Sequence, residues 1–217
     1  MATAQLTQGV EEYIEALWRV AGTGAAATKD LAQHLNVAPP SVTGMLKRLA
    51  GLGLVEYHPY GKAALSETGR QLAATIIRRH RLAERLLTDL IGLPWEKAHL
   101  EACRFEHLIT GEIEERLAAR LGEGATCPHG HPIDIATSDA SLALATAPLA
   151  TPLTVAAITD ESAEVLCYLA CLGIIPGAQL TVTGREPFVD GPLSVEVAER
   201  SCALGRQLAE KIRVVVG

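Results

Sequence analysis

The chain has 217 residues, of which 48% are hydrophobic and 4% aromatic, and its formal net charge is −6. This length can hold two or three small domains, each with its own core. The acidic balance argues against nucleic-acid binding by bulk charge alone, but it is compatible with a local basic surface.

The N-terminal segment and the cysteines indicate a cytoplasmic protein. Residues 1–9 lack the basic region and the apolar run of a secretory signal. The uncharged stretch 140–158 is interrupted by Pro148 and Pro152, so we expect a linker running into a strand and not a membrane span. An odd number of cysteines without a Cys-x-x-Cys pair is typical of reduced thiols. The five are Cys103, Cys127, Cys167, Cys171 and Cys202.

Three short helices and a hairpin are predicted within the first 65 residues. The first helix ends at Gly22, and Thr28 is a candidate N-cap for a second helix over 29–35. Pro40 suits the first position of a third helix, over 41–52. Residues 54–58 and 62–65 flank a turn and predict a β-hairpin. The buried face of the first helix is expected to consist of Val10, Ile14, Leu17, Trp18 and Ala21.

This order of elements predicts a winged helix-turn-helix, in which the second helix of the motif lies in the major groove of DNA. Small hydrogen-bond donors and cations on the outward side of the third helix suit base edges and phosphates. A helical hairpin with ordinary solvated charges is the competing interpretation. The expected DNA-binding residues are Thr28, Pro39, Pro40, Ser41, Thr43, Lys47, Arg48 and Lys62.

Two longer helices are expected next, one from Ser66 to about residue 90 and one over 95–121, separated by a break at 92–94. The first offers His80 and Glu84 one turn apart. On the second, four polar groups fall within an arc of roughly 100°, while Phe105, Leu108 and Ile109 point toward a core. Imidazole, thiolate and carboxylate on one stripe are divalent-metal ligands at helical spacing. The four groups belong to His99, Cys103, Glu106 and His107.

The last third of the chain predicts a small β-barrel. Strands are expected over 153–158, 179–183, 193–197 and 212–216, with short helices over 162–172 and 204–211. Cys167 and Cys171 lie four residues apart on an apolar helix, and we expect them in the core.

The runs 79–93 and 99–107 resemble the diphtheria toxin repressor and manganese transport regulator family of metal-dependent repressors, and the resemblance covers nearly the whole chain. It implies a mainly α fold with a C-terminal β module. A winged helix-turn-helix would occupy 1–73, a helical metal-binding and dimerisation domain with linker 74–148, and an SH3-like (FeoA-like) domain 149–217. The resemblance also implies that the protein is not an enzyme.

The resemblance further implies a homodimer that binds palindromic operator DNA when loaded with Mn(II) or Fe(II) and controls metal homeostasis genes. Two metal sites per protomer are implied. By position, the primary site would consist of Glu12, Cys103, Glu106 and His107, and Glu15 also matches a manganese-branch ligand. The ancillary site would consist of His80, Glu84 and His99, completed by Glu161 and Glu164.

The primary site would be a hybrid of the two branches. Glu12 stands where the toxin-repressor branch has a thioether, and Cys103 stands where the manganese branch has an acid. A carboxylate favours hard Mn(II), while a thiolate favours Fe(II) or softer ions. The expected cofactor is therefore Mn(II), Fe(II) or both.

Some alternatives stay open. Asp160, Glu161 and Glu164 could simply stabilise a helix N-terminus. The loop with Cys127, His129 and His131 looks like a zinc site, but a similar Pro-His-Gly segment occurs in the family as a loop without ligand duty. A helical metalloenzyme and a metal buffer are the competing functions, and metal-dependent DNA binding would separate a regulator from both.

Overall fold

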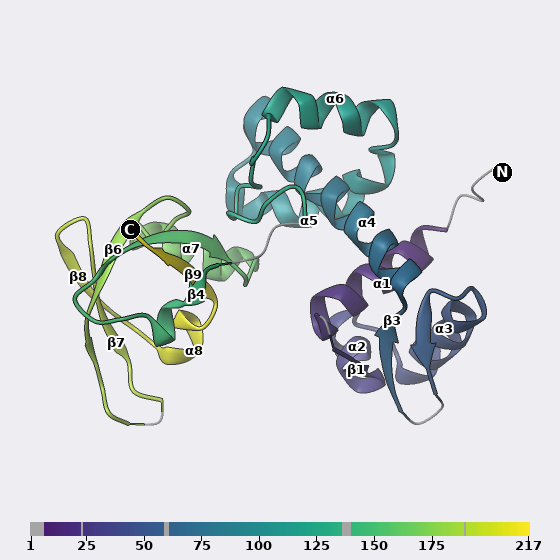
Figure 1. Cartoon of the computed structure of the whole chain (residues 1–217), viewed down its shortest axis with the longest axis horizontal. Coiled ribbons are helices and arrows are strands. Elements are labelled where there is room, and N and C mark those ends of the chain that lie inside the picture. The colour runs from purple at the N-terminus through teal and green to yellow at the C-terminus, as the bar shows by residue number, and fades with distance from the viewer. Residues whose placement is uncertain (1–6, 23, 59–60, 136–139, 189) are drawn as a thin grey trace. The chain divides into compact units, whose positions relative to one another are not determined.

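The computed structural model describes residues 7–22, 24–58, 61–135, 140–188 and 190–217. The chain forms two compact units, Met1–Arg79 and His80–Gly217 (Figure 1). Residues 1–6 and the hairpin residues 59 and 60, on which some of the predictions above fall, lie outside the described part. Among the described residues, no helix is long and apolar enough to cross a membrane.

The first unit is a winged helix-turn-helix, as predicted. Its core is formed by apolar positions at helical spacing, with Ile14, Leu17, Leu31, Leu46 and Leu49 fully buried. Strand β3 lies between β1 and β2 in a three-stranded antiparallel sheet. The elements run in the order α1 (Gln8–Ala21), β1 (Ala26–Ala27), α2 (Thr28–His34), α3 (Pro39–Gly51), β2 (Val55–Tyr57) and β3 (Lys62–Leu65).

Two helix starts in this unit differ from the prediction. Helix α3 begins at Pro39, with both prolines in its first turn, where their missing N–H groups cost no helical hydrogen bond. Thr28 is the first residue of α2 and not its N-cap, which is Ala27. The reason is the unpredicted strand β1, whose Ala27 pairs with Lys62.

The first of the two long helices forms as expected, and the second is interrupted. Helix α4 (Glu67–Arg85) continues into the π-helical turn η1 (Leu86–Leu90), and the Ser66 hydroxyl caps α4 by accepting the Gly69 N–H at 3.0 Å. Helix α5 (Trp95–Phe105) is followed by a 3₁₀ turn, η2 (Glu106–Leu108), and by α6 (Glu112–Leu121). Gly111 separates these segments with a φ of 45°, which a helix cannot contain.

The interruption changes which apolar residues are buried. Ile109 is buried as predicted, but Phe105 and Leu108 are 36% and 68% exposed. Because η2 turns more tightly than an α-helix, the facing expected from a continuous helix no longer holds there. Glu106 and His107 consequently sit on a 3₁₀ turn at the end of α5.

The C-terminal module is a six-stranded antiparallel sheet with strand order β4-β9-β5-β6-β7-β8. In β7, Leu193, Val195 and Val197 alternate with exposed residues, so one face covers the core. Strand β8 was not predicted, and β4 lies in the segment expected as a linker and pairs with β9. The elements are β4 (Leu142–Ala143), η3 (Leu144–Thr146), β5 (Pro152–Ile158), α7 (Ala163–Cys171), β6 (Gln179–Arg185), β7 (Leu193–Val197), β8 (Arg200–Leu204), α8 (Arg206–Ala209) and β9 (Ile212–Val216).

The prediction that Cys167 and Cys171 are core residues was wrong. Helix α7 buries Leu166 and Leu169 completely, and both cysteines are exposed. At about 100° per residue, Cys171 lies nearly opposite the direction midway between the two leucines. An apolar helix therefore has an exposed face that carries thiols.

We predict that Gly69→Ala destabilises the first unit. A Cβ at Gly69 would lie 2.0 Å from the carbonyl oxygen of Leu54, where α4 passes the start of the hairpin. Overpacking of this kind typically costs about 1–3 kcal/mol. Chemical denaturation should show the loss.

Gly44→Ala is the matched control, because it is also helical but a Cβ there would meet nothing within 4 Å. It should stabilise the protein by up to about 1 kcal/mol through helix propensity. Equal effects of the two substitutions would contradict the packing argument.

Candidate metal centre

A buried carboxylate, Glu84, lies at the centre of a group of imidazoles. His80 lies one turn before it on α4, and its Nε2 is 3.0 Å from Glu84 Oε1. From α5, His99 places its Nδ1 3.0 Å from the same His80 nitrogen and 3.4 Å from Glu84 Oε1. His80 and Glu84 are buried, so water cannot screen them.

The C-terminal module contributes an acid to this group. Glu161 Oε2 lies 2.8 Å from His99 Nδ1, and the ligand atoms of His80, Glu84, His99 and Glu161 all lie within 4.8 Å of one another. Glu164 is exposed and lies outside this group of ligand atoms. Asp160 instead accepts hydrogen bonds from the N–H and hydroxyl of Ser162, at 3.2 and 2.7 Å, just before α7 begins.

The loop after α6 brings two further potential ligands to Glu84. Cys127, His129 and Glu84 form a second group with ligand atoms within 4.8 Å of one another, and all three residues are buried. The sequence leaves a metal site in this loop open, whereas the family resemblance implies a loop without ligand duty. The close spacing of a cysteine and a histidine was the available signal, but only the folded loop shows that they reach Glu84.

The imidazole of His129 is oriented by a backbone carbonyl. Its Nε2 lies 3.0 Å from the carbonyl oxygen of Trp95, which can only accept, so Nε2 carries the proton. Nδ1 then faces Glu84 Oε1 at 3.2 Å. An imidazole that donates one N–H to a backbone carbonyl and points its other nitrogen at ligands is a common arrangement in metal sites.

Backbone contacts with strand β5 position this loop. Ile158 N–H donates to His129 O at 2.9 Å, and His131 Nε2 donates to Ile158 O at 2.9 Å. Gly130 has a φ of 91°, and a Cβ there would lie 2.0 Å from Ala156 O. Only glycine allows this close approach.

The charges in the cluster shift the pKa values of its members. Burial alone would lower the pKa of His80, but hydrogen bonds with Cys103, Glu106 and Glu84 outweigh it and hold that pKa well above the usual value. Burial likewise opposes the shift of His99, whose pKa is raised to about 9 by Glu161 and Glu84. Burial would raise the pKa of Glu84, but hydrogen bonds from the three histidines hold it well below the usual range.

The residues present fit a divalent cation. Glu84 Oε2 is buried and has no hydrogen-bond partner among the described residues, although a buried charged oxygen is costly without one. Around the Glu84 carboxylate, the carboxylate of Glu161, imidazoles and a thiol come together from four segments of the chain. A bound cation would supply the missing partner and replace the protons that the histidines otherwise carry.

The second predicted set lies next to this cluster within the same unit. Glu106 is buried, and its Oε2 lies 2.6 Å from His80 Nδ1, while His107 Nε2 is 3.7 Å from Glu106 Oε1. Cys103 Sγ groups with His80 and His99 within 4.8 Å. His80 therefore contacts Glu84 with one nitrogen and Glu106 with the other.

The two candidate ligands on α1 belong to the first unit. Glu12 is exposed, and its Oε1 accepts a hydrogen bond from Gln8 Nε2 at 3.0 Å. Glu15 is buried and pairs with Arg19 at 2.8 Å. Their part in metal binding stays a prediction.

Three domain families match the sequence in succession. Residues 5–63 match the N-terminal DNA binding domain of iron dependent repressors, 66–135 match their metal binding and dimerisation domain, and 142–216 match the FeoA domain. The iron-dependent repressor IdeR of Mycobacterium tuberculosis (strain ATCC 25618 / H37Rv) is 30% identical over 228 residues, which cover 97% of this chain and 98% of the relative. The chain belongs to the iron-dependent repressor family.

Other members of the family agree with this assignment. The diphtheria toxin repressor of Corynebacterium jeikeium (strain K411) is 40% identical over 129 residues, or 59% of this chain and 54% of that protein. A manganese-dependent transcriptional repressor, solved in complex with manganese, superposes with a TM-score of 0.86 at 29% identity and covers 96% of this chain and 100% of its own. Family members are transcriptional repressors and not enzymes, so the metalloenzyme interpretation is set aside.

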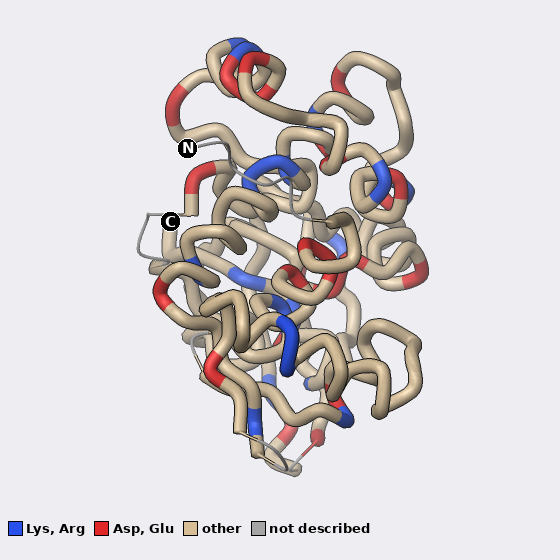
Figure 2. The backbone as a smooth tube through the Cα atoms, turned by 90° about the vertical axis from the view of Figure 1, so that its right-hand side faces the viewer, with Lys and Arg blue, Asp and Glu red and all other residues tan. Residues whose placement is uncertain are grey.

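The predicted DNA-binding residues of this repressor lie on its winged helix-turn-helix. All except the half-buried Thr28 and Thr43 are exposed, and the Thr43 hydroxyl donates to Pro39 O at 3.1 Å. Basic and acidic positions are interspersed along the backbone (Figure 2). A net charge of −6 is therefore compatible with a local basic surface on α3, where Lys47 and Arg48 are exposed.

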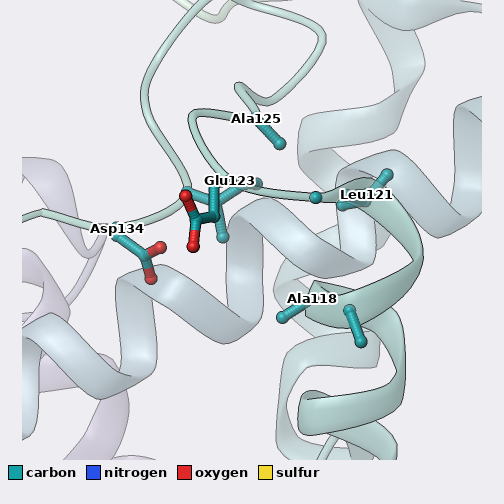
Figure 3. A pocket seen from close by; sticks show the side chains of 8 residues that line it. Ala118, Leu121, Glu123, Ala125 and Asp134 are labelled. Atoms are coloured by element: carbon teal, nitrogen blue, oxygen red, sulfur yellow. The ribbon is translucent and has the colours of Figure 1, made fainter.

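A separate cavity of about 330 Å³ lies between α6 and the loop that follows it. Figure 3 shows the carboxylates of Glu123 and Asp134 together with the apolar side chains of Ala118, Leu121 and Ala125. None of the predicted metal ligands lines it. This cavity is therefore not the metal centre.

We predict that metal affinity and the stability of the metal-free protein change in opposite directions with pH. The range runs from pH 6.5, the ordinary pKa of histidine, to about pH 9, the raised pKa of His99. Because the pKa of His99 is higher in the folded than in the unfolded protein, protonation of His99 stabilises the fold. This contribution is complete below pH 6.5 and is lost as the pH rises through about 9. Over the same range the metal meets less competition from protons. Metal affinity should rise with pH, while the melting temperature of the metal-free repressor should fall.

Calorimetric titration with Mn(II) in buffers of different ionisation enthalpy would measure the protons released on binding. Release of at least one proton per protomer at pH near 7 is expected, because His99 is then protonated in the metal-free protein. An affinity that does not change over this range would contradict the assignment of the imidazoles as ligands.

Proposed function

We propose that this chain is a transcriptional repressor that binds palindromic operator DNA as a homodimer in the cytoplasm when loaded with Mn(II) or Fe(II). The observation that carries the proposal is the buried cluster around Glu84, on a chain that also has a winged helix-turn-helix. Relatives named as iron-dependent and manganese-dependent repressors support both the regulatory role and this pair of metals.

One ion would bind at the Glu84 cluster. Its ligands would be drawn from His80, Glu84, His99 and Glu161, together with Cys127 and His129, which we add to the set expected from the sequence. Oxygen and imidazole ligands suit Mn(II), and one thiolate keeps Fe(II) competitive. Because Glu161 comes from the C-terminal module, the ion would connect that module to α4 and α5.

A second ion would bind to Cys103, Glu106, His107 and Glu12, with Glu15 as a further candidate. The place of Glu12 and Glu15 in this set rests on the family resemblance. Without metal, their carboxylates and that of Glu106 would repel one another if brought together. An ion offsets that repulsion and shifts the population toward the arrangement that binds DNA.

The two ions would be coupled through His80. Its Nδ1 contacts Glu106 and its Nε2 contacts Glu84, so an ion at Glu84 that takes Nε2 fixes Nδ1–H as a donor to Glu106. By thermodynamic linkage, metal must raise DNA affinity by the same factor by which DNA raises metal affinity.

We predict that DNA binding requires metal. Fluorescence anisotropy with palindromic promoter DNA should show tight binding in Mn(II) or anaerobic Fe(II) and weak binding after chelation. Glu12→Gln should weaken the metal response and leave the melting temperature nearly unchanged, because Glu12 is exposed. Glu115→Gln, the same loss of one negative charge at an exposed position on α6 outside the proposed metal and DNA-binding sets, is the matched control.

Equal DNA affinity with and without chelator would contradict the regulatory mechanism. A normal metal response of the Glu12→Gln variant would contradict only the place of Glu12 in the site.

We also predict that Cys127→Ser weakens the binding of one of the two proposed ions. Loss of partners outside the ligand shell already costs about 10- to 100-fold in metal affinity, so loss of a ligand should cost at least about tenfold. Equilibrium dialysis with elemental analysis would count the ions per protomer. Cys202→Ser is the matched control, since Cys202 is a half-buried thiol on β8. If the Cys127→Ser variant still binds two ions with unchanged affinity, Cys127 is not a metal ligand.

A further inference from the structure

Helix α7 presents two free thiols on the side turned away from the barrel core. Cys167 and Cys171 are exposed, whereas Leu166 and Leu169 on the opposite side are fully buried. Neither cysteine belongs to the groups of ligand atoms around Glu84 and His80. Core packing and the metal centres therefore leave this pair unexplained.

The spacing of the two thiols disfavours a disulfide between them. Residues four apart in a helix have Cβ atoms about 5–6 Å apart, whereas a disulfide requires about 3.5–4.5 Å. An atom that bridges two sulfur atoms through bonds of about 2.3 Å each lets them lie well beyond the S–S distance of about 2.0 Å in a disulfide. Rotation about the two Cα–Cβ bonds brings the sulfur atoms within reach of such an atom while the helix stays intact.

The end of α7 is held in place, so this spacing is fixed. Gly173 N–H donates to Ala170 O at 3.0 Å, and Ile174 N–H donates to Leu169 O at 2.9 Å. Gly173 has a φ of 77°, in the left-handed region that ends a helix, and Ile174 is fully buried directly after it. Cys171 in the last turn cannot move far from Cys167 without displacing these contacts.

The chemistry of the two thiols favours a soft, thiophilic partner. Helix α7 contains no basic residue, and the exposed Glu164 lies one turn before Cys167. Thiolates select soft ions, whereas the oxygen-rich cluster around Glu84 suits harder ones. We propose that Cys167 and Cys171 form a surface dithiol site for soft thiophilic compounds of the trivalent arsenic class, separate from the proposed Mn(II) or Fe(II) centres.

Phenylarsine oxide is a suitable probe of this dithiol. Two As–S bonds form and the As=O bond breaks. The oxygen leaves as water with the two thiol protons, and arsenic stays trivalent, so no oxidant or reductant is needed. A single thiol forms one As–S bond that a competing monothiol displaces, whereas two linked thiols hold arsenic more tightly through their effective concentration.

The test uses the full chain, saturated with Mn(II), and counts bound phenylarsenic by native mass spectrometry in the presence of excess 2-mercaptoethanol. One adduct per chain is expected. Cys167→Ser and Cys171→Ser should each weaken retention at least about 100-fold, the range that linking two binding groups provides. Cys202→Ser, a control with the same change elsewhere in the module, should retain the adduct, and bound Mn(II) should stay constant.

Retention of arsenic by the Cys167→Ser/Cys171→Ser double variant at the wild-type level would overturn the proposal, because another thiol would then hold it. Retention by the wild type no stronger than by the single variants would also overturn it, since no two-thiol adduct would form. Loss of Mn(II) on arsenic binding would overturn the separation of the two sites.

Discussion

The second unit is organised around the charge of Glu84. A fully buried carboxylate is unstable unless hydrogen bonds and opposite charge surround it, and here α4, α5 and the loop after α6 each supply an imidazole. Glu161 brings a second negative charge from the barrel to two of these histidines, His99 and His129. In the metal-free protein, protons on the imidazoles balance these charges. A divalent ion bound here would compete with these protons for the same nitrogen atoms, so the cluster that supports the fold would also respond to metal.

The sequence predicted most of the elements because their burial is periodic. Val10, Ile14 and Leu17 recur at helical spacing, and Leu193, Val195 and Val197 alternate, so both faces can be read without a structure. His80 and Glu84 could be paired for the same reason, since one helical turn separates them. The helix break at Gly111, four residues after the ligand stripe ends at His107, was missed. Helix propensity alone does not show where a glycine adopts a positive φ.

The contribution of the loop could not be predicted, since it depends on tertiary contacts. Cys127 and His129 reach Glu84 because Gly130 lets the loop approach β5 and because Trp95 O orients the imidazole. Strand β5 and Trp95, which make these contacts with the loop, are both far from it in the sequence. The five cysteines also differ in solvent exposure, and the apolar pattern of the sequence did not predict which of them are buried. Burial and the nearby carboxylates raise the pKa of Cys127 well above its usual value, which favours the neutral thiol until a metal displaces the proton. Cys167 and Cys171, which the apolar pattern placed in the core, are solvent-accessible instead.

These contacts show why the C-terminal module is more than an appended domain. Strand β5 supports the loop that carries His129, and the segment directly after β5 carries Glu161. An ion held by both would stabilise the barrel and the helices together. By mass action the gain is about 2.7 kcal/mol at a metal concentration 100 times the dissociation constant, a substantial fraction of the stability of a typical domain. Metal concentration would then set how firmly the module is held against α4 and α5. The response to metal would therefore involve the packing of the whole second unit and not the geometry of a few side chains alone.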